Sequence, residues 1–300
     1  MRTYFECIQC FVRQTLDAVR LLTDDETIHE QVLRKVLSES SGMDFYKSPP
    51  VMGQRIHRLI RELLEDDDPY YQIKEQSNRL AMKRYPELKM KIEQSFDPLE
   101  TAVRFAIAGN IIDQGVNSQL DESIIYKTLD DSMKKDLFPN SIDDFRNAID
   151  HSTDILYLGD NAGEIVFDRL LIEQLPSEKV AFVVRGHPVI NDVTHIDAEL
   201  TGMTDIVELI DNGSDAPGTI LEDCSPGFRT RFKKADLIIA KGQGNYESLS
   251  DIKKNILFLL IAKCPVIARD IGCDVGSLVL KTSFQEITVM MNNKKYAETT

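Results

Sequence analysis

The hydrophobic pattern of this 300-residue chain changes near its midpoint. Up to about residue 150, apolar residues recur at spacings of three and four, as on one face of a helix. After residue 151, short runs rich in β-branched residues alternate with helical stretches, starting with "DILYLG" at 154–159. This alternation is typical of a mostly parallel sheet covered by helices on both faces. We therefore expect an α/β protein with a helical domain at 1–150 and an α/β domain at 151–300.

The expected elements follow from period and from turn residues. The first half contains helical segments at 10–22, 25–39, 48–64, 68–85, 97–115 and 141–152, and shows no clear strand. The second half contains strand-like runs at 154–159, 179–186, 204–211 and 235–242, with a last pair at 256–262 and 264–272. The carboxyl ends of parallel strands meet at one edge of a sheet, which is where such proteins bind ligands.

Charge and cysteine content limit the partners and the compartment. The formal net charge is −14, which argues against nucleic acid or an anionic membrane as a partner, because both require a basic surface. The longest purely apolar run, at 256–262, is too short to span a membrane, and the start of the chain does not resemble a secretory signal. Five cysteines, an odd number, favour a reducing cytoplasm with few or no disulfides.

Acid and amide side chains follow two of the predicted strands. Asp160 and Asn161 come directly after the first strand, and Asn191 and Asp192 follow the second. Two carboxylates and an amide oxygen make a hard oxygen site, suited to Mg²⁺ or Mn²⁺. Taken singly, the first pair could simply cap a helix and the second could be an ordinary turn.

Groups suited to phosphate lie at the same predicted edge. Lys241 ends a later strand in "AKGQGNYE" and supplies a positive charge, although it could also be a solvated strand exit. The backbone amides of Ala162 and Gly163, at the start of the next helix, could hold phosphate oxygens. The coincidence of polar residues at three strand ends favours a binding site over separate caps and turns.

The helical half offers one further pair of polar residues, in "FAIAGNIIDQG". Asn110 and Asp113 are three positions apart and so share a helix face. They either cap the end of that helix or line a cleft between the two halves.

The sequence resembles the metal-dependent damage-control phosphatase family, long known as a family of unknown function. The resemblance rests on "GNIIDQG", "YLGDNAGEIVFDRLL", "VRGHPVINDVT" and "IIAKGQGNYE", with "CIQCFVRQ" at the start. These segments cover nearly the whole chain in the family's order, and their joint pattern is specific. They are most similar to the stand-alone archaeal and bacterial branch, which carries an N-terminal Cys-x-x-Cys.

The resemblance implies a helical part packed on a Rossmann-like three-layer α/β/α domain. It implies a divalent metal, Mn²⁺, Co²⁺, Ni²⁺ or Mg²⁺, held by Asp160, Asn161 and Asp192. By the same resemblance, the catalytic residues are Asp160, Asp113 and Asn110. The residues that bind the substrate or its phosphate are Lys241, Asn245 and Glu164, together with the backbone amides of Ala162 and Gly163. Glu247 matches a further motif of the branch.

The function implied is hydrolysis of phosphate monoesters of small metabolites, such as sugar phosphates, phosphopantetheine-like compounds or damaged phosphometabolites. The attacking group would be either water or the Asp160 carboxylate. The alternatives are an S-adenosylmethionine-dependent carboxyl methyltransferase, which the fold alone permits, and a non-catalytic metal- or metabolite-binding protein. Against the methyltransferase, "LGDNAGE" lacks the fuller glycine pattern of a dinucleotide site.

The cysteine pair at the start has two interpretations. Cys7 and Cys10 have the spacing of zinc ligands, but the sequence contains no second such pair. A four-sulfur site would need two of the other cysteines to converge on them. We therefore favour packing of small apolar thiols between helices.

Overall fold

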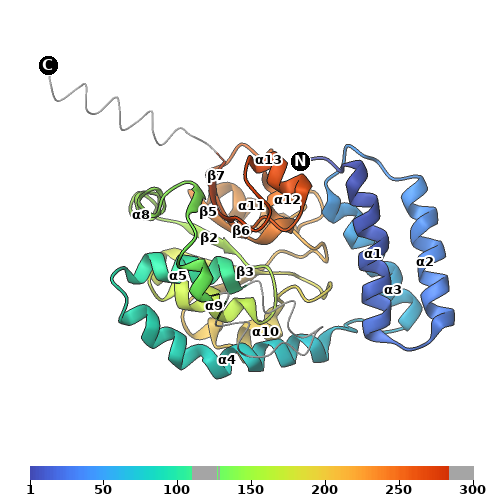
Figure 1. Ribbon diagram of the computed structural model, residues 1–300, viewed down its shortest axis with the longest axis horizontal. Helices are drawn as coiled ribbons and strands as arrows, with labels where there is room; N and C mark the ends of the chain where they lie inside the picture. Colours follow the sequence, from blue (N-terminus) through green and yellow to red (C-terminus); the bar gives the residue numbers. More distant parts are fainter. Residues whose placement is uncertain (110–126, 128, 284–300) are drawn as a thin grey trace, which may run out of the picture.

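The computed structural model describes residues 1–109, 127 and 129–283. Its centre is a seven-stranded sheet in the order β1-β7-β6-β5-β2-β3-β4 (Figure 1). The strands are β1 (Leu137–Pro139), β2 (Ile155–Leu158), β3 (Val180–Val184), β4 (Glu208–Asp211), β5 (Leu237–Lys241), β6 (Ile256–Ile261) and β7 (Leu278–Thr282). Strands β2 to β6 are parallel, β7 is antiparallel to β6, and β1 pairs parallel to β7. The predicted mostly parallel sheet is confirmed.

Side chains alternate between two cores along each central strand. In β2, Ile155 and Tyr157 contribute to one core, and Leu156 and Leu158 to the other. The first core is covered by α4 (Tyr71–Glu93), α5 (Pro98–Ala108), α8 (Ile142–Asp150), α9 (Glu164–Ile172) and α10 (His195–Leu200). The second is covered by α11 (Pro226–Lys234), α12 (Gly242–Leu249) and α13 (Pro265–Ile271). Because both faces are buried, β2, β3 and β6 are apolar throughout rather than alternating with polar residues.

The strand order fixes where a ligand can bind. From β2 the chain moves outward through β3 to β4, then returns to β5 on the opposite side of β2. The connections leaving β2 and β5 therefore run on opposite faces, which creates a topological switch point between these two strands. In open α/β sheets the crevice at the carboxyl ends of such strands is the usual binding site.

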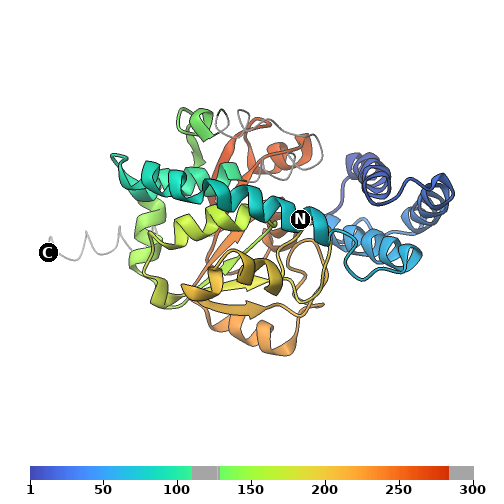
Figure 2. The ribbon, with the colours of Figure 1, turned by 90° about the horizontal axis from the view of Figure 1, so that it is seen from below.

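The first three helices form a separate cluster beside the sheet. Helices α1 (Phe5–Leu22), α2 (Glu26–Ser41) and α3 (Pro49–Leu64) enclose their own small core, and the cluster stands apart from the α/β body in Figure 2. Helices α4 and α5, in contrast, pack on the sheet and share its core. The hydrophobic cores therefore do not divide at residue 150.

Charged side chains connect the helical cluster to the sheet. Arg58 and Arg61 of α3 both pair with Asp215, in the loop after β4, and Gln54 donates to the same carboxylate at 2.6 Å. Burial raises the pKa of Asp215, but the hydrogen bonds from these three side chains outweigh burial and lower it to about 2. This contact places α1 and α3 over the carboxyl edge of the sheet.

Three expectations about single elements are wrong. Residues 264–272 form α13 rather than a strand, because Pro265 occupies the first turn of a helix. The strand paired with β6 is β7, which the sequence did not indicate, and β1 is a short strand in the half expected to be helical. The run 204–211 forms a strand only from Glu208, after a 3₁₀ turn. Within the described residues, no helix combines the length and the apolar character needed to cross a membrane.

Candidate active site

The three predicted metal-binding residues lie together at the switch point. The loop after β2 pairs with the loop after β3 through an isolated bridge between Asn161 and Asp192. In the same pairing the amide of Val193 donates to the carbonyl oxygen of Asp160 at 2.8 Å. All three predicted residues are buried, with 4 to 9% of their surface exposed. Two residues 32 positions apart are thus brought to one point by parallel strands, as predicted.

Hydrogen bonds orient the Asn161 side chain. Its amide nitrogen donates to Asp160 Oδ2 at 2.9 Å and to Glu164 Oε2 at 3.0 Å. Both amide protons are therefore used on carboxylates, and the oxygen Oδ1 is left as the atom that suits a metal. In the described part of the chain, no three His, Cys, Asp or Glu side chains form a metal-binding group. This candidate centre has two carboxylates and takes its third ligand from an amide.

Arg185 is a site residue that the sequence analysis missed. It follows β3, its side chain is fully buried, and its Nε donates to Asp192 Oδ2 at 2.7 Å. Its Nη2 lies 4.0 Å from Asp160 Oδ1. One guanidinium therefore lies beside both acids that were predicted to bind the metal, and it fixes Asp192. The signal was present, since Arg185 ends the strand-like run "KVAFVVR" like the other polar residues at strand ends.

Lys241 is used inside the protein. Its side chain is fully buried, and its ammonium group donates to Glu164 Oε1 at 2.7 Å, Asp168 Oδ1 at 2.5 Å and the Ala106 carbonyl at 2.8 Å. Three protons thus meet three protein acceptors. This arrangement departs from the expectation that Lys241 contacts phosphate. It instead makes Lys241 the counter-ion of two carboxylates beneath the site.

Burial dominates the pKa of Asp168, whereas the neighbouring carboxylates together dominate the pKa of Lys241. Burial raises the pKa of Asp168 to about 6, although the Lys241 ammonium opposes that shift. For Lys241, burial lowers the pKa, but Asp168 and Glu164 outweigh burial and hold it above its ordinary value. Both members of the pair are therefore charged at neutral pH. Asp168 lies four residues after Glu164, on the same face of a mainly apolar helix, and this spacing was its signal in the sequence.

The expected phosphate-binding amides also have protein partners. The amide of Ala162 donates to the carbonyl oxygen of Asn191 at 2.8 Å. The amide of Gly163 donates to Asn78 Oδ1, on α4, at 2.7 Å. The amides therefore hold the loop in place, and this geometry differs from a phosphate cradle.

Asn245 has a similar internal role. Its amide nitrogen donates to the carbonyl oxygens of Gly159 and Lys241, and its oxygen accepts from the Thr219 hydroxyl at 2.8 Å. It is fully buried. Asn245 thus connects the ends of β2 and β5 rather than facing a ligand. The predicted residues Asn110 and Asp113 lie outside the described residues.

The environment of Asp160 is strongly acidic. Burial raises the pKa of Asp160 well above its ordinary value, and the negative charges of Glu164 and Asp192 raise it further. Arg185 and Lys263 oppose that rise with their positive charge. A divalent cation would relieve the same repulsion, which is the electrostatic condition for a metal site.

A glycine allows a second loop to approach Asp160 closely. Gly242, at the start of α12, has φ +76°, and a Cβ there would lie 1.9 Å from Asp160 Oδ2. No other residue type fits without moving the carboxylate. Helix α12 therefore begins in contact with the candidate metal site.

The site opens into a cavity of about 610 Å³ between the sheet and the helical cluster. It is lined by Asp160, Asn161 and Asp192, by residues of α1 and α3, and by the loop before α13. The basic side chains in its wall are Arg13 of α1 and Lys263 after β6. Lys263 was missed by the sequence analysis although it too follows a strand.

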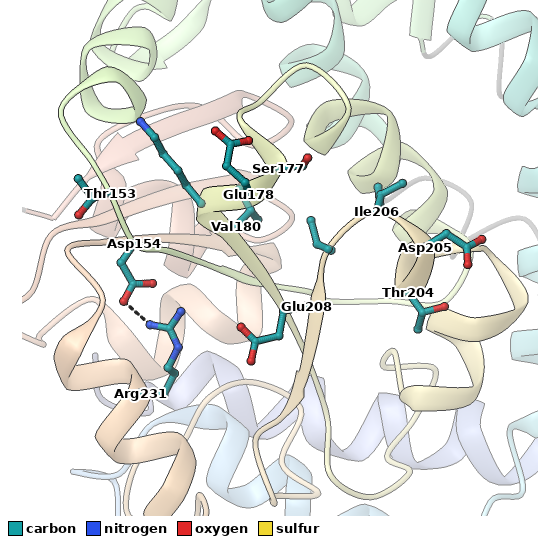
Figure 3. Close-up of a pocket in the computed structure, with 12 residues that line it drawn as sticks. Thr153, Asp154, Ser177, Glu178, Val180, Thr204, Asp205, Ile206, Glu208 and Arg231 are labelled. Atoms are coloured by element: carbon teal, nitrogen blue, oxygen red, sulfur yellow. Dashed lines mark hydrogen bonds and ion pairs between the residues drawn. The ribbon is translucent and has the colours of Figure 1, made fainter.

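A second hollow of about 650 Å³ lies at the opposite edge of the sheet (Figure 3). Its residues precede strands, as Thr153 and Glu178 do, and Asp154 pairs there with Arg231. It contains none of the residues gathered at the switch point. The chemistry therefore points to the carboxyl edge.

Cys7 and Cys10 face the same cavity with Cys264. All three are free and half-buried, and burial raises the pKa of Cys7 and of Cys10. We expect Cys7→Ala/Cys10→Ala to lower the melting temperature while leaving turnover largely intact, because the thiols pack rather than react. Differential scanning fluorimetry and steady-state kinetics measure both quantities. Loss of one bound zinc per chain, detected by elemental analysis, would contradict the packing interpretation.

Fold and site together define a Rossmann-like α/β protein with a buried acid–amide centre at its switch point. The family model described as the damage-control phosphatase ARMT1-like domain matches residues 3–279. The chain therefore belongs to the damage-control phosphatase family, which confirms the resemblance seen in the sequence.

Relatives support this over nearly the whole length. A damage-control phosphatase of Archaeoglobus fulgidus is 38% identical over 287 residues, covering 92% of this chain and 97% of the relative. A damage-control phosphatase of Pyrococcus horikoshii is 32% identical over 286 residues, covering 93% and 97%. A crystal structure of a DUF89 family protein from Pyrococcus horikoshii matches with a TM-score of 0.86 at 31% identity, covering 95% of this chain and 100% of that one.

Proposed function

We propose that the protein is a metal-dependent phosphatase that hydrolyses phosphate monoesters of small metabolites. The observation that carries this proposal is the charge of the buried cluster. Four carboxylates, Asp160, Asp192, Glu164 and Asp168, surround two cations, Arg185 and Lys241. With all four carboxyls ionised, the cluster carries two net negative charges (four carboxylates against two cations). One divalent ion would neutralise this excess, which otherwise raises the pKa of Asp160. Buried charges need such compensation because they have lost their hydration.

The donor set fits a hard divalent cation. Asp160, Asn161 and Asp192 would offer oxygen ligands to Mn²⁺, Co²⁺, Ni²⁺ or Mg²⁺. When bound, the ion would polarise a phosphoryl oxygen and lower the pKa of water. Arg185 and Lys241 would hold the acids in position without binding the substrate.

The phosphoryl group would be bound by other cations than the one first expected. Lys263 and Arg13 line the cavity next to Asp160, and the positive charge of Lys263 reaches that carboxylate. We propose that they bind the remaining phosphoryl oxygens, as charge stabilisation requires. Because Asp160 would be occupied as a metal ligand, we propose water rather than this carboxylate as the nucleophile.

The cavity is consistent with a small metabolite. Its volume of about 610 Å³ lies within the usual range for small-molecule sites. Its wall combines apolar residues such as Pro49 and Val266 with the polar Gln9, Gln14 and Gln243. Sugar phosphates, phosphopantetheine-like compounds and damaged phosphometabolites are the substrate classes we propose.

Metal dependence tests the proposed function. The purified protein is expected to hydrolyse p-nitrophenyl phosphate with Mn²⁺, to lose this activity in excess chelator, and to regain it with Mn²⁺, Co²⁺, Ni²⁺ or Mg²⁺. The reason is that the ion, held by the oxygen ligands, would polarise the phosphoryl group and activate the water, which Arg13 and Lys263 cannot do in its place. Full activity in chelator, with no metal by elemental analysis, would refute the metal requirement. Methyl transfer from S-adenosylmethionine without ester hydrolysis would support the rival activity.

A further inference from the structure

Hydrolysis of an alkyl phosphate needs a proton for the leaving group. Water forms a new bond to phosphorus, the ester P–O bond breaks, and the departing oxygen must become an alcohol, because an alkoxide is a strongly basic leaving group. General acids supply this proton in many enzymes. None of the cavity-lining residues that the structure describes is a histidine. Apart from the metal-binding acids, the carboxyl groups in this wall belong to Glu6 and Glu247.

Helix α12 positions Glu247 relative to the metal site. The helix begins at Gly242, directly against the Asp160 carboxylate. Glu247 is five residues later, which corresponds to about 7.5 Å along the helix axis. It lines the same cavity as Asp160, Asn161 and Asp192. Glu247 therefore shares a cavity wall with the residues that would hold the metal, about one and a half helical turns from the point where α12 meets Asp160.

The surroundings of Glu247 favour a protonated carboxyl. Gln243 donates to its Oε1 at 2.9 Å, and the amine of Met1 donates to its backbone carbonyl at 3.0 Å while pairing with Asp251. The thiols of Cys7 and Cys10 lie within electrostatic range of Glu247. Cys264, Arg13 and Lys263 lie in the same cavity wall. Burial raises the pKa of Glu247 to about 7, against the lowering effects of Gln243 and the Met1 amine.

Glu6 offers a contrast within the same cavity. Its carboxylate is about half exposed and contacts Arg269 at 3.3 Å. A hydrogen bond from its own backbone and the contact with Arg269 lower its pKa. Glu6 is therefore an anion at neutral pH and has no proton to give.

We propose that Glu247 is the general acid of the reaction and protonates the departing alcohol oxygen. This inference rests on the proposed phosphatase function. In the step, the Glu247 proton moves to the ester oxygen as the P–O bond breaks, and the attacking water provides the proton that restores the carboxyl. The products are the alcohol and inorganic phosphate. Hydrolysis of substrates with basic leaving groups, such as alkyl phosphates, therefore depends on the proton of Glu247.

Two esters with different leaving groups test the proposal. The Mn²⁺-loaded parent and Glu247→Gln are compared on glycerol phosphate, whose leaving group needs a proton, and on p-nitrophenyl phosphate, whose leaving group is weakly basic. We expect kcat/KM for glycerol phosphate to fall about 10²- to 10⁴-fold, as for loss of a general acid. On p-nitrophenyl phosphate we expect a fall of less than about tenfold. We expect the parent to lose rate on glycerol phosphate above pH 7, as Glu247 loses its proton, and we expect this decline to be absent in Glu247→Gln.

Controls separate this role from structure and from the proposed function. Glu247→Gln should bind Mn²⁺ as the parent does in calorimetric titration, since Glu247 is not a metal ligand. Glu247→Asp should keep the decline above pH 7 at a lower rate, and Glu6→Gln should change neither ester. If Glu247→Gln loses kcat/KM equally on both esters, or keeps the decline above pH 7, Glu247 is not the general acid. The proposed phosphatase function would not be affected by that result. If the parent hydrolyses neither ester with any of the four metals, the phosphatase function fails, and the role of Glu247 fails with it.

Discussion

Asp192→Asn is expected to bind Mn²⁺ much more weakly and to lower turnover at fixed metal by about 10²-fold or more, comparable with loss of one well-placed electrostatic group. The structure gives a specific reason. Arg185 Nε donates to Asp192 Oδ2 at 2.7 Å. An asparagine at 192 has one oxygen, and the guanidinium would take it. The amide NH₂ would then face the metal position, where it cannot act as a ligand.

Calorimetric titration of Mn²⁺ into both proteins measures this change directly. Metal should also raise the melting temperature less in Asp192→Asn than in the parent, because stabilisation by a ligand follows its affinity. Asp211→Asn is a matched control: Asp211 is also an acid at the carboxyl end of a strand, but it is exposed and accepts a hydrogen bond from the Gly213 amide. Equal Mn²⁺ affinity in Asp192→Asn and the parent would mean that Asp192 is a turn residue and that Asp160 has another partner.

Lys241→Met is expected to lower the free energy of unfolding by about 3–5 kcal/mol, the usual cost of removing one partner from a buried ion pair. The variant would leave Glu164 and Asp168 buried without their shared cation. The same change should affect metal binding less than stability, because Lys241 lies beneath the site rather than in the cavity. Urea denaturation in chelator measures the stability, and Mn²⁺ titration measures the binding.

The difference in free energy of unfolding between the parent and Lys241→Met should become smaller as pH falls from 7 towards 5. In the parent, burial already raises the pKa of Asp168 from 3.8 to about 6. Removal of the lysine raises it further, so the folded state binds more protons than the unfolded state across this range. Stability then rises as pH falls. The double variant Lys241→Met/Asp168→Asn should recover part of the lost free energy of unfolding. Lys134→Met, which changes an exposed lysine, should not lower the free energy of unfolding. A Lys241→Met protein as stable as the parent would rule out the counter-ion role.

The sequence alone determined the class of fold and predicted which acid and amide side chains meet at the carboxyl edge of the sheet. Period and β-branched composition indicated four of the parallel strands closely enough to place Asp160 and Asp192 at strand ends. Parallel strands bring such ends to one edge whatever the details of packing, so the meeting of Asp160, Asn161 and Asp192 at that edge could be predicted. Whether a residue lies at the end of a strand depends mainly on the few residues around it, so the hydrophobic pattern of the sequence predicts it well.

Partnership between distant residues was decided only by the tertiary structure. The sequence could not show that Lys241 faces Glu164 and Asp168, because which face a strand-end side chain takes depends on packing between β5 and α9. It also could not show that Cys264 lies near Cys7, or that β7 rather than 264–272 pairs with β6. Burial made the final difference: a buried ammonium must satisfy its protons within the protein. The lysine that the pattern assigned to phosphate is therefore a structural counter-ion, and the cations in the cavity wall are Arg13 and Lys263.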